Sequence, residues 1–127
     1  MFGAERASRI SPTRSTVQRD MVFTTHNDAP IVPPNMLRLL WATANRVTRS
    51  GQTLGPEQRI SVYQALMSIT MHAAYQMFEE DSKGSITEGK WADLVVLSAN
   101  PLQVDAKDLQ DIEVRATYSR GLPIYHQ

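Results

Sequence analysis

The 127-residue sequence contains no cysteine, which excludes disulfide bonds, thiolate metal sites and a cysteine nucleophile. The sequence also has no excess of positive or of negative residues. Thirteen Lys and Arg residues balance thirteen Asp and Glu residues, so the formal net charge is zero. A neutral chain gives no bulk electrostatic reason to bind nucleic acid or an anionic membrane. We therefore predict no nucleic acid and no membrane among its partners.

Long apolar runs are also absent. No stretch approaches the roughly 20 consecutive apolar residues of a membrane span. Residues 1–6 form no apolar segment of signal-peptide length, and a cytoplasmic location is the resulting expectation. The residues that are present, 42% hydrophobic and 20% charged, can bury a core, and the length lies within the range of one domain.

Helices are expected in three stretches, which are residues 13–19, 36–48 and 61–78, and in the last two of them apolar residues recur at helical spacing. Gly51 follows the second stretch as a candidate left-handed cap. The third opens on Ser61-x-x-Gln64, the pattern of a capping box, in which the two side chains satisfy backbone N–H groups at the start of a helix. We expect a break in this helix near Thr70.

The stretch Met21-Val-Phe-Thr-Thr-His-Asn-Asp-Ala-Pro30 is apolar and β-branched at its start and polar at its end. Residues 21–26 are predicted to form a buried parallel strand, because both alternating faces begin with apolar residues. His26 and Asp28 would then lie on one side of the strand at its C-terminal end, where ligands bind in α/β folds. The alternative interpretations are a capping role for Asp28 before a turn and a hydrogen-bonded core position for His26.

From about residue 84 the pattern changes from helical to β. A short strand is expected at residues 85–86, followed by strands at residues 92–97, 112–119 and 122–125. Arg120-Gly121 supplies a hairpin turn between the last two strands, and we interpret Asp93 as a turn-capping residue. The chain therefore divides at residues 81–84 into an α/β part and an all-β part.

The predicted strand at residues 21–26 has no partner in the α/β part. Its two edges would leave backbone N–H and C=O groups unpaired, which is costly away from water. Because the chain offers no neighbouring parallel strand, we interpret it as the tail end of a larger α/β protein.

Four segments carry a family resemblance: Arg9-Ile-Ser-Pro-Thr-Arg14, Phe23-Thr-Thr-His-Asn-Asp-Ala-Pro-Ile-Val-Pro-Pro34, Asn45-Arg-Val-Thr-Arg49 and Gly84-Ser-Ile-Thr-Glu-Gly-Lys-Trp-Ala-Asp-Leu-Val-Val-Leu97. Together they resemble the C-terminal part of the amidohydrolase superfamily, and its family 3, YtcJ-like branch in particular. The resemblance implies an α/β fold, the C-terminal fragment of a (β/α)8 TIM-barrel metallohydrolase followed by part of a small β-sandwich. Residues 1–83 would form the last barrel strand with its covering helices, and residues 84–127 the C-terminal half of the sandwich.

The activity that the resemblance implies is metal-dependent hydrolysis of a C–N bond, other than a peptide bond, in a small-molecule substrate. By position, Asp28 matches the family's acidic residue that binds a divalent metal, most often zinc, and acts as general base. His26 is the candidate substrate-binding residue beside it. A carboxylate is a zinc ligand, a bound metal lowers the pKa of its water, and a nearby carboxylate can move the proton.

Residues for the rest of such a metal site are missing. The family's other metal ligands, among them a His-x-His pair, have no match here, because His72 falls in a covering helix and His126 lies beside the last residue. One carboxylate does not hold a catalytic zinc, which takes three protein ligands, so whether this chain acts as an enzyme stays open at this point. The alternative is a non-catalytic remnant or an interaction module that works through self-association or with a complementing polypeptide.

Overall fold

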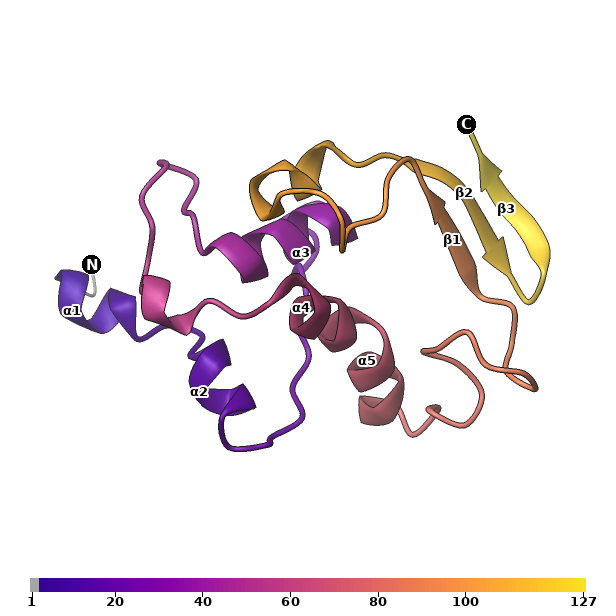
Figure 1. Ribbon diagram of the computed structural model, residues 1–127, viewed down its shortest axis with the longest axis horizontal. Helices are drawn as coiled ribbons and strands as arrows, with labels where there is room; N and C mark the ends of the chain where they lie inside the picture. Colours follow the sequence, from indigo (N-terminus) through magenta and orange to yellow (C-terminus); the bar gives the residue numbers. More distant parts are fainter. Residues whose placement is uncertain (1–2) are drawn as a thin grey trace.

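The computed structural model describes residues 3–127. Short helices make up one end and the middle, and a three-stranded sheet forms the opposite end together with the C-terminus (Figure 1). With η marking 3-10 helices, the elements in chain order are α1 Gly3–Ser8, α2 Thr13–Val17, α3 Met36–Asn45, η1 Pro56–Gln58, α4 Val62–Ile69, α5 Met71–Gln76, β1 Leu94–Leu97, η2 Ala106–Asp111, β2 Val114–Ser119 and β3 Leu122–His126.

Helix α3 begins and ends on local signals of its own sequence. The side chain of Asn35 caps its start by accepting the N–H of Arg38 at 2.9 Å, which satisfies one of the free donors of the first turn. The helix ends at Arg46, which takes the left-handed conformation with φ of 56°. Gly51 is therefore not the cap, as the spacing had predicted, and it lies in the loop that follows.

The capping box at Ser61 and the break near Thr70 are both confirmed. Ser61 Oγ accepts the N–H of Gln64, and the Gln64 side chain accepts the N–H of Ser61, so α4 starts with two satisfied donors. At Thr70 the backbone leaves the helical region, with φ of −126° and ψ of −93°, which separates α4 from α5.

The hydrophobic core lies between α3, α4 and η2. Its buried members are Leu40, Ala44, Ile60, Ala65, Leu109 and Ile112. Two hydrogen bonds hold η2 on α3: Trp41 Nε1 donates to the carbonyl of Lys107 at 2.9 Å, and Asn45 Nδ2 donates to the carbonyl of Ala106 at 2.7 Å. The predicted division into domains between residues 83 and 84 stays a prediction. The core contains side chains from both predicted parts, since Leu40 and Ala65 pack with Leu109 and Ile112.

The sheet is antiparallel, in the order β1-β2-β3, and it projects beyond the helices (Figure 1). Its strands and the hairpin at Arg120-Gly121 agree with the sequence prediction. Asp93 Oδ1 accepts the N–H of Arg120 at 2.8 Å, so the predicted turn-capping role of Asp93 is confirmed. Every residue of β3 is exposed.

Residues 21–26 run extended between α2 and α3, but they enter no ladder. The predicted strand is therefore wrong for this chain, because a strand forms only when a neighbour pairs with its backbone. Within residues 3–127 the strands β1, β2 and β3 pair only with one another. The short strand expected at residues 85–86 is absent for the same reason. What the fold retains is a small α/β unit of helices and one sheet.

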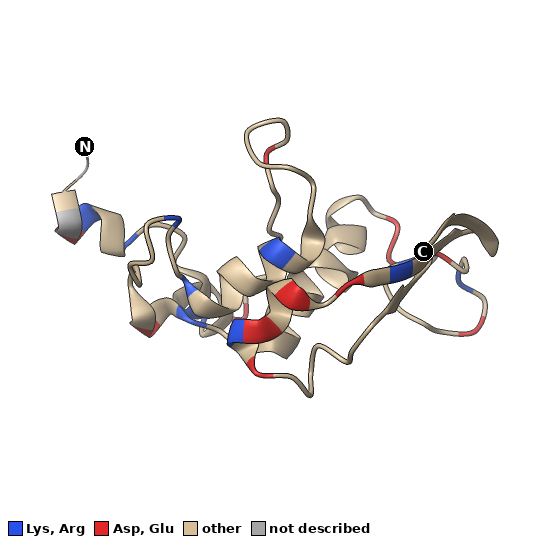
Figure 2. Cartoon of the chain, turned by 90° about the horizontal axis from the view of Figure 1, so that it is seen from above, with Lys and Arg blue, Asp and Glu red and all other residues tan. Residues whose placement is uncertain are grey.

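Charged residues of both signs are spread over the chain. Figure 2 shows Lys and Arg interspersed with Asp and Glu on the helices and loops. The ion pairs between them are few and largely exposed, as in Arg9–Glu5 at 3.1 Å and Arg115–Glu113 at 3.0 Å, so they add little stability. No helix within residues 3–127 is long and apolar enough to cross a membrane.

The substitution Leu109→Ala is expected to lower the free energy of unfolding by about 2–5 kcal/mol, because it deletes a fully buried side chain from the core. Urea denaturation followed by circular dichroism measures this change. The matched control is Leu102→Ala, at a half-exposed leucine in the same connection, which should change stability by less than about 0.5 kcal/mol. Equal losses in the two variants would contradict the assignment of Leu109 to the core.

Candidate functional site

The extended segment, residues 21–27, is held against α4 and α5 by side-chain hydrogen bonds. Ser68 is fully buried, and its hydroxyl donates to the carbonyl of Ala65 at 2.7 Å. Because a hydroxyl has one proton to give, Thr25 Oγ1 is the donor in its 2.9 Å contact with Ser68 Oγ. His72 Nδ1 lies 3.1 Å from the carbonyl oxygen of Phe23 and donates to it when that nitrogen carries the proton. These contacts fix the segment at positions 23 and 25.

The backbone of this segment is otherwise unpaired. Within the described residues, no N–H group of residues 22–27 donates a hydrogen bond. Phe23, Thr24, Thr25 and Asn27 are nevertheless only partly exposed. The segment is therefore held by contacts with the side chains of Ser68 and His72 and by no backbone ladder among the described residues.

His26 and Asp28, the two residues predicted for the site, meet at the end of the segment. The N–H of Asp28 donates to His26 Nδ1 at 3.1 Å, an arrangement that puts the ring proton on Nε2. Asp28 takes a left-handed conformation with φ of 55°, and its carbonyl accepts the N–H of Ile31 at 2.9 Å, which closes a turn. Both residues are exposed, so the Asp28 carboxylate faces water.

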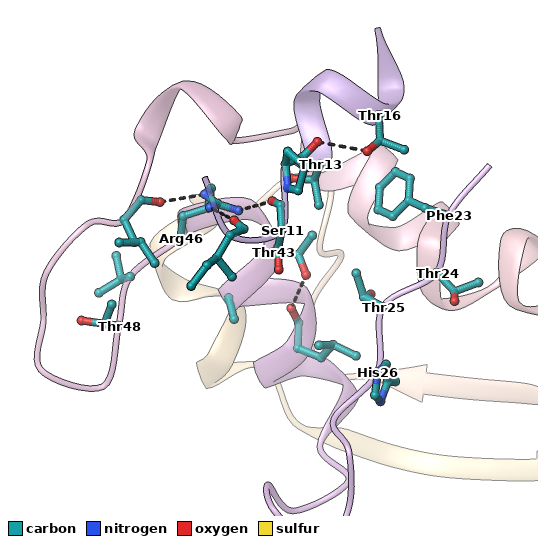
Figure 3. A pocket seen from close by; sticks show the side chains of 16 residues that line it. Ser11, Thr13, Thr16, Phe23, Thr24, Thr25, His26, Thr43, Arg46 and Thr48 are labelled. Carbon is teal, nitrogen blue, oxygen red and sulfur yellow. Dashed lines mark hydrogen bonds between the residues drawn. The ribbon is translucent and has the colours of Figure 1, made fainter. Parts of the chain in front are cut away.

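Two hollows meet at His26. The first, of about 520 Å³, lies between the extended segment and α3 and is lined by Thr24, Thr25 and His26 on one side (Figure 3). The second, of about 610 Å³, lies between His26, Asn27 and the residues of α3 and η2. Asp28 lines neither hollow. The structure thus brings His26 to a ligand-sized space and leaves Asp28 on the turn beside it.

Arg46 closes the far end of the first hollow (Figure 3). Its guanidinium donates to three backbone carbonyls, those of Ile10 at 2.6 Å, Ser11 at 2.7 Å and Leu54 at 2.7 Å. Burial lowers the pKa of Arg46, and the charge of Glu57 partly opposes this. With three of its five N–H donors bound to the main chain, Arg46 ties loops together. Sequence reasoning missed this role, although Arg46 belongs to the segment Asn45-Arg-Val-Thr-Arg49.

A complete metal site is not present in the part of the chain that the structure describes. Residues 3–127 bring no three His, Asp or Glu side chains within reach of one ion. His72 contacts the carbonyl of Phe23, and His126 ends β3, so neither joins Asp28. A catalytic zinc takes three protein ligands and keeps one open position. These residues therefore do not fit a catalytic metal by themselves.

Comparisons with known proteins agree on one family. A family model described as "Amidohydrolase family" matches residues 1–125. The N-substituted formamide deformylase of Arthrobacter pascens is 26% identical over 119 residues, which are 94% of this chain and 22% of that protein. The protein YtcJ of Bacillus subtilis, whose name assigns it to the amidohydrolases, is 26% identical over 129 residues, which are 99% of this chain and 24% of that protein.

A solved structure shares the fold. The crystal structure of an amidohydrolase from Thermotoga maritima MSB8 superimposes with a TM-score of 0.64 at 24% identity, over 91% of this chain and 26% of that one. This likeness extends to most of the helices and the sheet described above. The chain spans 22% to 24% of the length of the two curated relatives.

The backbone amides of residues 23–26 are expected to exchange with solvent deuterium rapidly, because none of them has a hydrogen-bond acceptor among the described residues. The amide of Ala65, buried in α4 and bonded to the carbonyl of Ser61 at 3.0 Å, should exchange slowly in the same sample. Hydrogen exchange read by NMR compares the two. Strong protection of residues 23–26 in a monomer would show that the segment is paired after all.

Proposed function

Because the chain belongs to the amidohydrolase family, whose model matches residues 1–125, we propose that it serves the hydrolysis of a C–N bond, other than a peptide bond, in a small molecule. The match over almost the whole chain is the observation that carries this proposal. The name of the Arthrobacter pascens relative, an N-substituted formamide deformylase, points to an amide-type bond. Amides of small acids are therefore the substrates to test first.

The proposed role of Asp28 is that of the general base. Its carboxylate is exposed and makes no ion pair within the described residues. In amide hydrolysis, water attacks the carbonyl carbon and gives up one proton, which a carboxylate at hydrogen-bond distance accepts. Asp28 then returns that proton to the nitrogen of the leaving group as the C–N bond breaks. His26, which lines both hollows, is proposed to contact the substrate.

A divalent metal, zinc by resemblance, would supply a polarised water to this reaction. Asp28 is the residue of this chain that would bind it, and the described residues offer no set of three ligands around it. The remaining ligands would have to come from polypeptide outside residues 3–127. On this proposal the chain contributes a proton-transfer group to a site that it does not complete.

The proposed place of residues 21–27 is the last strand of a (β/α)8 barrel. Three observations support it: the segment is extended, the N–H groups of residues 22–27 are unpaired among the described residues, and α4 and α5 contact it through Ser68 and His72. Asp28 then stands at the C-terminal end of the strand, where barrel enzymes carry their catalytic groups. The sheet of β1, β2 and β3 would be one half of the accompanying β-sandwich.

A second candidate function is an interaction module without catalysis. Exposed apolar side chains favour it: Met21 is 58% exposed, Val22 51%, Leu122 70% and Ile124 65%. Apolar surface of this kind marks sites that bind a partner or a second copy of the chain. Light scattering shows whether the purified chain self-associates, and binding of a hydrophobic dye shows whether it exposes an apolar surface. A clean monomer that binds no dye would contradict this candidate.

In a preparation that hydrolyses an amide, Asp28→Asn is expected to lower kcat by about two to four orders of magnitude, because asparagine cannot accept the proton. Asparagine tolerates the left-handed conformation of Asp28, so the turn should persist. Asp20→Asn is the matched control, at another exposed aspartate with positive φ, 52°, and should leave kcat unchanged. The measurement is kcat of the wild type and of both variants on simple amides and N-acyl amino acids. Undiminished turnover in Asp28→Asn would rule out the proposed base.

The 127-residue chain alone is expected to bind less than one zinc ion per molecule and to hydrolyse neither N-substituted formamides nor N-acyl amino acids, because its described residues gather no three ligands. Metal analysis after dialysis gives the zinc content, and product assays give the turnover. Tight binding of one zinc per chain, abolished by Asp28→Asn, would overturn the incomplete-site proposal.

A further inference from the structure

The second hollow at His26 has a cationic side that the proposed chemistry does not use. Arg38, from the first turn of α3, and Arg49, from the loop after α3, both line this space of about 610 Å³. His26 and Asn27 line it from the extended segment. This space is called the arginine hollow below.

Within residues 3–127 the side chain of neither arginine makes an ion pair or a hydrogen bond. The ion pairs among the described residues are Arg9–Glu5, Lys83–Glu79, Lys107–Asp105 and Arg115–Glu113, so Arg38 and Arg49 belong to none of them. The contrast with Arg46 is direct, since that guanidinium is spent on three carbonyls. Arg38 and Arg49 keep their donors available to a ligand.

The remaining wall of the arginine hollow is partly polar, with Asn35, Thr48 and Gln110, and partly apolar. Val32, Leu39, Trp41 and Val47 contribute to the apolar part. The indole of Trp41 cannot turn freely, because its N–H donates to the carbonyl of Lys107 at 2.9 Å. Aromatic and apolar side chains together with a few charged groups are the usual lining of a site that takes a small molecule.

We propose that the arginine hollow binds a small organic carboxylate, with the carboxylate on Arg38 and Arg49 and the apolar body against Trp41 and Leu39. The planar guanidinium fork matches a carboxylate in two parallel hydrogen bonds. The volume of about 610 Å³ exceeds what an inorganic anion fills, and it leaves room for an apolar group.

Asp111, at the end of η2, lines the same hollow. Its negative charge opposes an anion in the hollow, so the net positive charge there is smaller than the two arginines alone would give. Removing this charge strengthens the binding of a carboxylate. A substitution that damaged the fold would weaken carboxylate binding. A gain in affinity on removing the Asp111 charge therefore indicates a binding site and not a merely structural pair of arginines.

The position of the hollow connects it with the proposed reaction. His26 and Asn27 line it and directly precede Asp28 in the chain. A carboxylate anchored on the arginines therefore holds its molecule against the two residues that precede the proposed base, which makes the substrate an amide that carries an acid group. Only this identification of the ligand as substrate rests on the proposed function, because binding can be measured without turnover.

The test uses benzoate, which has a carboxylate and an apolar ring, with benzamide as its neutral isostere and inorganic phosphate as a second anion. The indole N–H signal of Trp41, assigned with Trp91→Phe, reports binding in NMR titrations of the 127-residue chain. Benzoate is expected to shift this signal saturably, and benzamide to leave it in place. Arg38→Gln and Arg49→Gln should each weaken benzoate binding about tenfold or more, because each removes charge-assisted hydrogen bonds.

Three further variants complete the experiment. Arg14→Gln, at an exposed arginine outside the hollow, should leave the affinity unchanged. Arg49→Lys keeps the charge without the fork, and should bind benzoate between wild type and Arg49→Gln. Asp111→Asn should tighten binding up to about fivefold, as expected for one charge removed near the ligand. Circular dichroism verifies that every variant is folded.

Several outcomes would overturn the proposal. The first is that benzoate does not shift the Trp41 signal. The second is that benzamide binds as tightly as benzoate. The third is that Arg14→Gln loses as much affinity for benzoate as Arg38→Gln and Arg49→Gln do. Phosphate binding as tight as that of benzoate would overturn the organic acid as the ligand. Benzoate binding is measured without turnover, so absence of amide hydrolysis in a preparation with a complete metal site would contradict the proposed function and leave the carboxylate site intact.

Discussion

The contact between Thr25 and the buried hydroxyl of Ser68 determines where the candidate site can be. Ser68 gives its proton to its own helix and so can only accept from Thr25, which fixes which face of the extended segment meets α4. In a sheet, a ladder of backbone hydrogen bonds holds a strand in place. Here the Thr25–Ser68 bond and the contact of His72 with the Phe23 carbonyl hold the extended segment. The position of His26, and of Asp28 after it, follows from these two anchors.

The elements that the sequence predicted are those whose signals are local. Ser61 and Gln64 satisfy each other's backbone donors, and the turn at Arg120-Gly121 joins two strands that are adjacent in the chain. Such features depend on residues a few positions apart, and they appear where the pattern placed them. A hydrogen bond from the Asp28 N–H to His26 Nδ1 joins the two predicted site residues, and their roles in metal and substrate binding stay predictions.

The features that could not be read from the sequence depend on distant residues. Residues 21–26 have the composition of a strand, yet a ladder needs a neighbour, and the described residues supply none. Helix η2 has a local cap, since Asp105 accepts the N–H of Lys107 at 3.0 Å, a bond that lowers the pKa of Asp105. Its place on α3, however, depends on Trp41 and Asn45 about sixty residues earlier. The arginine hollow arises from the same long-range packing.

The break at Thr70 has a mechanical consequence. Ser68 lies before it on α4 and His72 after it on α5, so the two anchors of the extended segment stand on opposite sides of a joint. The extended segment therefore connects α4 to α5 across the break at Thr70. A change in the angle between the two helices would shift the anchors relative to each other, and the motion would pass along the segment to the turn that carries Asp28.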